Sequence, residues 1–270
     1  MQNYAERRST GNATDASDLY GTGIRIGLYL QSLGMLFSGV NIVIQHKKGA
    51  LGVKLLCASN VIAILSSWSA QCRARQMSPA EAWIVLNLVS MLFIPAGVAI
   101  YNPHAVVGEA LGIFLLGVAI FWIDVAQLWF WATLYRSLPS LGTPGLAWIF
   151  VNVRITGWFR DFALVGASTG LLFGLLALGG AFWLCVKAWV EKKEDLDVSD
   201  DTHGCLSFLA GPGIFVGVVW IFAVAAAEIM IKSNGLTPQT DLSQPGQSIP
   251  FVLGLITLVD GILSICKLMK

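Results

Sequence analysis

The segment DLYGTGIRIGLYLQ (residues 18–31) leads from a polar amino-terminal region into the first long apolar run. Some of its side chains are polar or charged and fit poorly in hydrocarbon: Asp18, Arg25, Tyr29 and Gln31. Glycines lie among them, at Gly21, Gly23 and Gly27. Residues three or four positions apart share one face of a helix. The segment therefore predicts a helix with a small and polar face that is shielded from lipid.

The composition indicates an integral membrane protein, with the lipid bilayer as its first partner. The chain has 270 residues, of which 56% are hydrophobic and 12% are charged, and its mean hydropathy is +0.70. Soluble domains average about 25% charged residues. The net charge of +1 gives no reason to expect a nucleic-acid partner.

Apolar runs define the predicted architecture. A helix needs about 20 mostly apolar residues to cross the hydrocarbon core. The runs that meet or approach this length cover about 22–44, 50–69, 80–101, 106–134, 165–190, 206–231 and 250–268. They predict an all-α polytopic protein with about seven transmembrane helices, or six if the second and third runs form a re-entrant pair. We expect a polar tail over 1–21 and a single transmembrane domain over 22–268.

The connections between the runs have distinct characters. Ser78 and Pro79 precede the third run and predict a helix start, with serine as N-cap and proline at the first helical position. The apolar part of the segment 136–162 is too short to cross a membrane. We expect a loop, a strand, a cap over the bundle or an interfacial helix there. The segment 191–204 is strongly charged and predicts a solvated loop.

A small and polar stripe follows the whole first run. Its members are spaced three or four residues apart: Gly23, Gly27, Gln31, Gly34, Ser38, Asn41 and Gln45. Such a stripe faces protein or water, because lipid offers polar groups no partner. Two interpretations stay open. The stripe packs closely on another helix, for which small residues are suited, or it lines a water-filled path.

Charged residues inside the runs need partners or water. Arg25 lies off the stripe, and it either reaches the headgroups or pairs with Glu81 or Glu109 on another helix. A charge at bilayer depth costs about 2.5–3.5 kcal/mol on insertion scales. The candidates for an ion or proton path are Asp124, Gln127, Glu228 and Asp260, together with Gln31, Ser38 and Asn41 of the stripe. The alternative is a protonated carboxyl group that makes a structural hydrogen bond.

Glycines at helical spacing predict packing faces, within the chain or between copies. They are Gly27, Gly34, Gly166, Gly170, Gly174, Gly213 and Gly217. No phosphate-binding loop, HExxH or GxSxG motif occurs, so we expect no enzymatic activity, and no cofactor is implied. The five cysteines are irregularly spaced and predict neither a metal site nor a disulfide framework.

The two ends of the chain carry a family resemblance. Tyr20-Gly21, Gly23-Ile24-Arg25, Gly27, Tyr29-Leu30-Gln31, Gly246-Gln247 and Ile249-Pro250 resemble an uncharacterised family of multi-pass membrane proteins of filamentous fungi. The resemblance covers the chain ends, and the middle only in its hydropathy. It implies a fungal membrane protein and transfers no activity.

We expect a membrane channel or ion-conducting transporter that forms a homo-oligomer and moves a cation or proton. This expectation rests on the polar stripes of the helices, the carboxylates deep in the apolar runs and the lack of enzymatic motifs. The alternatives are a seven-span receptor or sensor with a small-ligand pocket and a membrane scaffold or assembly protein. The sequon at Asn12 favours an amino terminus outside and a carboxyl terminus in the cytoplasm, and we expect the plasma membrane.

Overall fold

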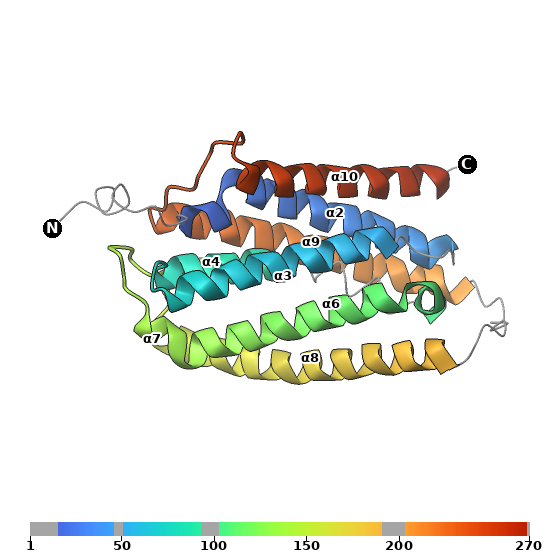
Figure 1. Ribbon diagram of the computed structural model, residues 1–270, viewed down its shortest axis with the longest axis horizontal. Coiled ribbons are helices and arrows are strands. Elements are labelled where there is room, and N and C mark those ends of the chain that lie inside the picture. The colour runs from blue at the N-terminus through green and yellow to red at the C-terminus, as the bar shows by residue number, and fades with distance from the viewer. Residues whose placement is uncertain (1–15, 46–50, 93–102, 191–202, 269–270) are drawn as a thin grey trace.

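The computed structural model describes residues 16–45, 51–92, 103–190 and 203–268, which are mostly helical. Its long helices lie along one common axis (Figure 1). In chain order the elements are η1 (Ala16–Tyr20), α2 (Thr22–Gln45), α3 (Leu51–Arg73), α4 (Pro79–Ser90), α6 (Pro103–Trp129), η2 (Phe130–Leu134), α7 (Tyr135–Ser137), β1 (Leu146–Ile149), β2 (Val151–Arg154), α8 (Trp158–Val190), α9 (His203–Ser233) and α10 (Pro245–Leu268). Each predicted apolar run therefore contributes a helix.

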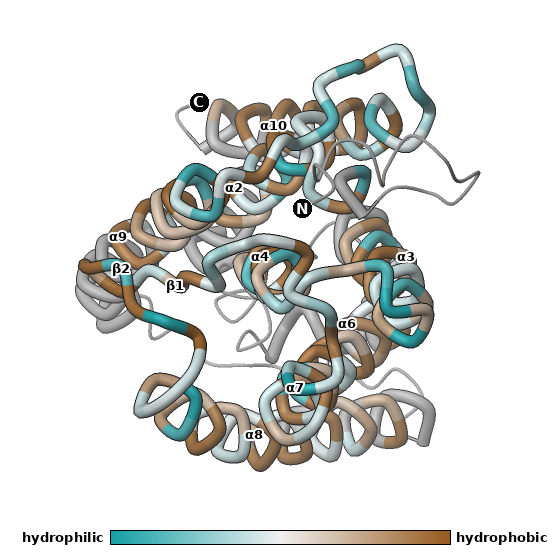
Figure 2. Tube along the Cα trace, turned by 90° about the vertical axis from the view of Figure 1, so that its left-hand side faces the viewer, coloured by the Kyte–Doolittle hydropathy of each residue, from teal (hydrophilic) through white to brown (hydrophobic). Residues whose placement is uncertain are grey.

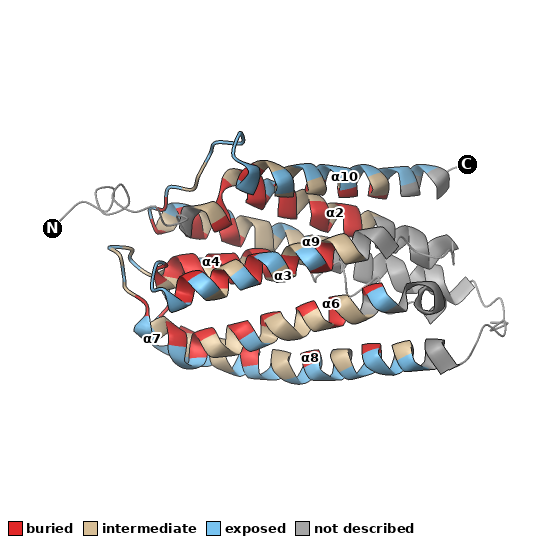
Figure 3. Ribbon diagram, viewed as in Figure 1, coloured by how far each residue is buried: buried red, intermediate tan, exposed pale blue. Residues whose placement is uncertain are grey.

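Some of these helices are long and apolar enough to cross a membrane. In the described part of the chain, four stretches qualify: Leu55–Arg73, Phe114–Ser137, Trp158–Trp183 and Pro245–Leu263. Large apolar side chains on α8 and α10 are exposed, among them Phe173, Trp183 and Ile256. Figure 3 shows this exposure along the outer faces of α8 and α10. Surfaces of this kind suit contact with lipid.

The core is built around α4. Figure 2 looks along the helices and shows α4 in the middle, with α2, α3, α6 and α9 around it. Eight of its residues are buried, from Ala80 to Val89. Its start is the predicted one: Ser78 is the N-cap, Pro79 follows, and the Ser78 side chain accepts a hydrogen bond from the Glu81 backbone N–H at 3.3 Å. The sequence prediction for this helix start is confirmed.

Aromatic rings join α4 to the elements at one end of the bundle. Trp83 of α4 lies 4.8 Å from Trp131 and 6.1 Å from Phe130, both in η2, between ring centroids. Phe159 at the start of α8 lies 5.4 Å from Trp131, edge to face. Such ring pairs contribute about 0.5–1.5 kcal/mol each beyond their buried area. They hold the ends of α6 and α8 against the core.

The segment 136–162 contains an antiparallel hairpin of β1 and β2, so of the predicted alternatives the strand is the one found. Phe150, at the turn, has a positive φ of 62°. Its ring lies 4.7 Å from Phe222 of α9, and Trp148 lies 5.0 Å from the same ring. Asn234 accepts a hydrogen bond from the Leu146 N–H (2.8 Å) and donates one to the Leu146 carbonyl (2.7 Å). The hairpin is thus fastened to the end of α9.

The packed part of the chain begins before residue 22. The expected tail over 1–21 ends in the short helix η1, and Tyr20 within it is fully buried. Its hydroxyl donates to Glu81 Oε1 at 2.7 Å. Residues 1–15 and most of the charged segment 191–204 lie outside the described residues.

Candidate functional site

A polar cluster joins α2 to α9 near one end of the bundle. Arg25 forms an ion pair with Glu228 through its Nη1 atom. The Tyr29 hydroxyl donates to Glu228 Oε1 at 2.8 Å. Arg25 and Tyr29 stand one turn apart on α2, so both reach the same carboxylate. The Arg25 side chain is 11% exposed and that of Glu228 is 46% exposed, so the cluster opens toward the surface on the glutamate side.

The expected partners of Arg25, Glu81 and Glu109, are both wrong. Glu81 is fully buried in the capping box of α4, where its Oε2 accepts from the Ser78 N–H at 2.8 Å. The start of α6, which carries Glu109, lies at the opposite end of the helices from the start of α2, which carries Arg25 (Figure 1). The end of the sixth apolar run and the start of the first lie on one side of a seven-span protein. Glu81 at the start of the third run lies on that side too, so topology excludes Glu109 but does not choose between Glu81 and Glu228. The sequence analysis placed Glu228 in an ion path.

The start of α2 and the start of α10, far apart in sequence, meet in space. Gln247, near the start of α10, accepts hydrogen bonds at Oε1 from the backbone N–H groups of Gly23 (3.1 Å) and Ile24 (3.3 Å). Its Nε2 donates to the Asp18 carbonyl at 2.8 Å. A glutamine more than 200 positions away thus satisfies the free N–H groups at the start of α2. The hydrogen bonds of Gln247 thus fasten the start of α10 to the start of α2.

Replacing Gln247 with alanine is expected to lower the free energy of unfolding by about 2 kcal/mol, because buried N–H groups of α2 lose their acceptor. Denaturant titration in detergent, followed by circular dichroism, measures the change. Gln244→Ala is the matched control, since that side chain is exposed and only its backbone carbonyl is used. Equal losses in both variants would contradict the capping role.

The glycines of the polar stripe lie against α10. A Cβ atom at Gly23, Gly27 or Gly34 would overlap backbone atoms of Gln247, Pro250 or Thr257, respectively. Gln31, fully buried, accepts a hydrogen bond at Oε1 from Asn60 Nδ2 of α3 at 3.0 Å. Between Gly23 and Gly34 the stripe therefore packs on other helices. The side chains of Ser38, Asn41 and Gln45 lie outside the described residues.

The remaining candidate groups are spread over different helices and do not form one site. Gln127 Nε2 donates to Ser90 Oγ at 2.8 Å and links α6 to α4. Asp260 of α10 has a buried Oδ2 atom without a hydrogen-bond partner. Gly166 and Gly217 have open space where a side chain would begin, so no described helix packs on them, and the surroundings of Gly213 lie outside the described residues.

Asp124 occupies a notch between α6 and α8. A Cβ atom at Gly170 would come within 3.1 Å of Asp124 Oδ1, and one at Gly174 would overlap Oδ2. The predicted glycine face of α8 thus accommodates a carboxylate. Asp124 stands near the middle of the candidate span Phe114–Ser137. Within the described part of the chain it makes no hydrogen bond or ion pair.

No groups of histidine, cysteine, aspartate and glutamate suited to a metal ion occur among the described residues. Comparison of the chain with protein-family models, with curated proteins and with solved structures gives no match.

Proposed function

We propose that this chain is a seven-pass membrane protein that moves a proton or a small cation across the bilayer, as a channel or an ion-conducting transporter, with Asp124 as the binding group. The seven apolar runs support the number of passes. Six long helices lie along the common axis, and α4 begins at the same end as α2 (Figure 1). A further pass that starts with α4 is part of the proposal.

Asp124 is the observation that carries the proposal. A carboxylate at mid-span costs about 2.5–3.5 kcal/mol unless a proton, a cation or water compensates its charge. Arg25 and Glu228 compensate each other, whereas Asp124 faces two glycines that supply no counter-charge. A Cβ atom at either glycine would meet a carboxylate oxygen, so the two glycines let the carboxylate lie close to the backbone of α8. A proton or a small cation that binds and leaves Asp124 fits this geometry.

The path that we propose runs along the α6–α8 contact. The centre of the described core, around α4, is filled by apolar side chains such as Ile84 and Leu88. In contrast, α8 lies against α6 by one side only, and its other side is exposed. Assembly of copies through α8 would enclose the Asp124 notch between subunits. A homo-oligomer in the plasma membrane, with its amino terminus outside, is part of the proposal.

The closed core around α4 favours a second candidate, a seven-span sensor that transmits a signal and moves no ion. Because α4 contacts α2, α3, α6 and α9, a shift of one of these helices would reach the others through α4. Flux separates the two functions.

Purified protein in liposomes with an internal pH dye tests the proposal. An imposed potential drives proton entry, and sodium or potassium gradients test the cations. Asp124→Asn is expected to reduce the flux at least about 100-fold, because an amide side chain does not ionise and so can neither take up and release a proton nor supply a negative charge to a cation. Asp161→Asn removes an exposed carboxylate at the start of α8 and is expected to leave the flux unchanged.

Circular dichroism and size-exclusion elution check that both variants fold. Wild-type flux equal to that of empty liposomes over pH 5–8, or unchanged flux in Asp124→Asn, would refute transport through Asp124.

A further inference from the structure

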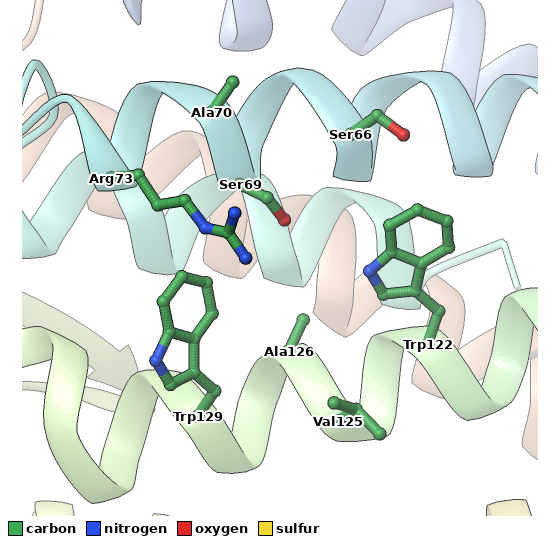
Figure 4. A pocket seen from close by; sticks show the side chains of 8 residues that line it. All are labelled: Ser66, Ser69, Ala70, Arg73, Trp122, Val125, Ala126 and Trp129. Carbon is green, nitrogen blue, oxygen red and sulfur yellow. The ribbon is translucent and has the colours of Figure 1, made fainter.

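A groove opens between α3 and α6 on the outer side of the helices. It has a volume of about 500 Å³ and is lined by Ser66, Ser69, Ala70, Arg73, Trp122, Val125, Ala126 and Trp129. Figure 4 shows the serines and Arg73 on α3, facing the two tryptophans of α6. Both helices contain candidate membrane spans. Ser66, Ala70, Arg73 and Val125 are exposed, so the groove opens toward the region that lipid would occupy.

The groove is charged at one end and apolar further in. Arg73 is the last residue of the span Leu55–Arg73, which places it at the level of the headgroups. Its guanidinium lies 6.0 Å from the centre of the Trp129 ring. Within the described residues it has no ion-pair partner. Trp122 stands two turns from Trp129 along α6, about 10 Å deeper.

The aromatic wall of the groove is held in place from the core. Trp68 of α3 meets Trp129 edge to face, with 5.8 Å between ring centroids. Trp68 is fully buried, and its Nε1 donates to the Ala82 carbonyl of α4 at 3.0 Å. The position of Trp129, and with it the platform under Arg73, therefore depends on the core and not on a ligand. A preformed site loses little free energy to ordering when it binds.

We propose that this groove binds one phospholipid with an anionic headgroup. The Arg73 guanidinium donates to the phosphate, as arginine does in fork-like pairs with phosphate. Because Arg73 has no ion-pair partner among the described residues, its charge favours a headgroup with a net negative charge over a zwitterionic one. The Ser69 hydroxyl, which makes no hydrogen bond within the described part of the chain, faces the groove beside it (Figure 4). An acyl chain lies along Trp122, Val125 and Ala126. A soluble anion would leave this apolar wall unused, which is why a lipid fits better.

Native mass spectrometry of the detergent-solubilised full chain tests the proposal. The protein is mixed with equal amounts of phosphatidylglycerol and phosphatidylcholine, and bound lipids are counted. We expect the wild type to prefer phosphatidylglycerol. Arg73→Gln is expected to reduce that preference about fivefold, the effect of one basic residue near anionic lipid.

Arg75→Gln is the matched control, because it removes the same charge two residues away and outside the groove. It is expected to change the preference less than Arg73→Gln does. Trp122→Leu, which keeps both arginines, is expected to weaken the binding of both lipids alike.

Equal loss in the two arginine variants, or no preference in the wild type, would overturn the proposal. Glycerol 3-phosphate supplies the headgroup phosphate without acyl chains. Displacement of the lipid by millimolar glycerol 3-phosphate would mark a site for soluble anions and would likewise overturn it.

Discussion

Replacing Gly27 with valine is expected to lower the free energy of unfolding by about 3 kcal/mol, because overpacking forces backbones apart. A Cβ atom at Gly27 would overlap the Pro250 carbonyl and lie 2.9 Å from the Phe251 nitrogen. Gly254 presents the same constraint from α10, since a Cβ atom there would lie 2.7 Å from the Gly27 Cα atom. If α2 and α10 move apart to make room for the side chain, they lose their packing along the whole contact. The expected fall in the free energy of unfolding is therefore large.

Denaturant titration of purified protein in detergent measures the change, with the melting temperature as a second reading. Gly166→Val is the matched control, because open space surrounds that position within the chain. It is expected to change the free energy of unfolding by less than about 0.5 kcal/mol. A Gly27→Val variant as stable as the wild type would show that α2 and α10 do not pack through their glycines.

Replacing Glu228 with alanine is expected to lower the free energy of unfolding by about 3 kcal/mol. This is at the lower end of the range for breaking a buried ion pair, because the Glu228 side chain is half-exposed. The cost arises at Arg25, whose guanidinium stays buried without its counter-charge. The double variant Arg25→Met/Glu228→Leu is expected to recover most of the stability, since no charge is then left unpaired.

The surface pair Arg160–Asp161 supplies the control for this experiment. Its N–O distance is 3.1 Å, and the Asp161 side chain is 72% exposed. Asp161→Ala is therefore expected to cost no more than about 1 kcal/mol. If Asp161→Ala and Glu228→Ala were equally costly, or if the double variant were less stable than Glu228→Ala alone, the pair would not act as a buried ion pair.

Much of the helical architecture is predictable from local sequence. Each apolar run contains a helix, and Ser78 with Pro79 marks the start of α4, since helix boundaries depend on nearby groups that satisfy free N–H donors. Gly27 and Gly34, which stand out in sequence as small residues at helical spacing, lie against the backbone of α10. In contrast, the predicted partners of Arg25 are wrong for two different reasons. Glu109 lies on a helix that starts at the other end, whereas Glu81 lies at the same end but is bonded to Ser78 and Tyr20.

The candidate site was predictable only as a set of residue types. Asp124 stands out in sequence as a deep carboxylate, and Gly170 and Gly174 stand out as a packing face. That the carboxylate lies over those two glycines depends on the register between α6 and α8. Register between helices follows from the fit of side chains on two separate segments, and hydropathy carries no information on it.

The sequence by itself therefore determined the helices, their apolar faces and the residues too polar or too small to face lipid, because these properties depend on neighbours within one or two turns. Only the tertiary structure decided which distant segments contact those residues. It places α10 against the glycines of α2, Gln247 at the start of α2, and Glu228 beside Arg25. Backbone approach and charge pairing between helices depend on steric fit across more than 200 residues of chain, which no local pattern encodes.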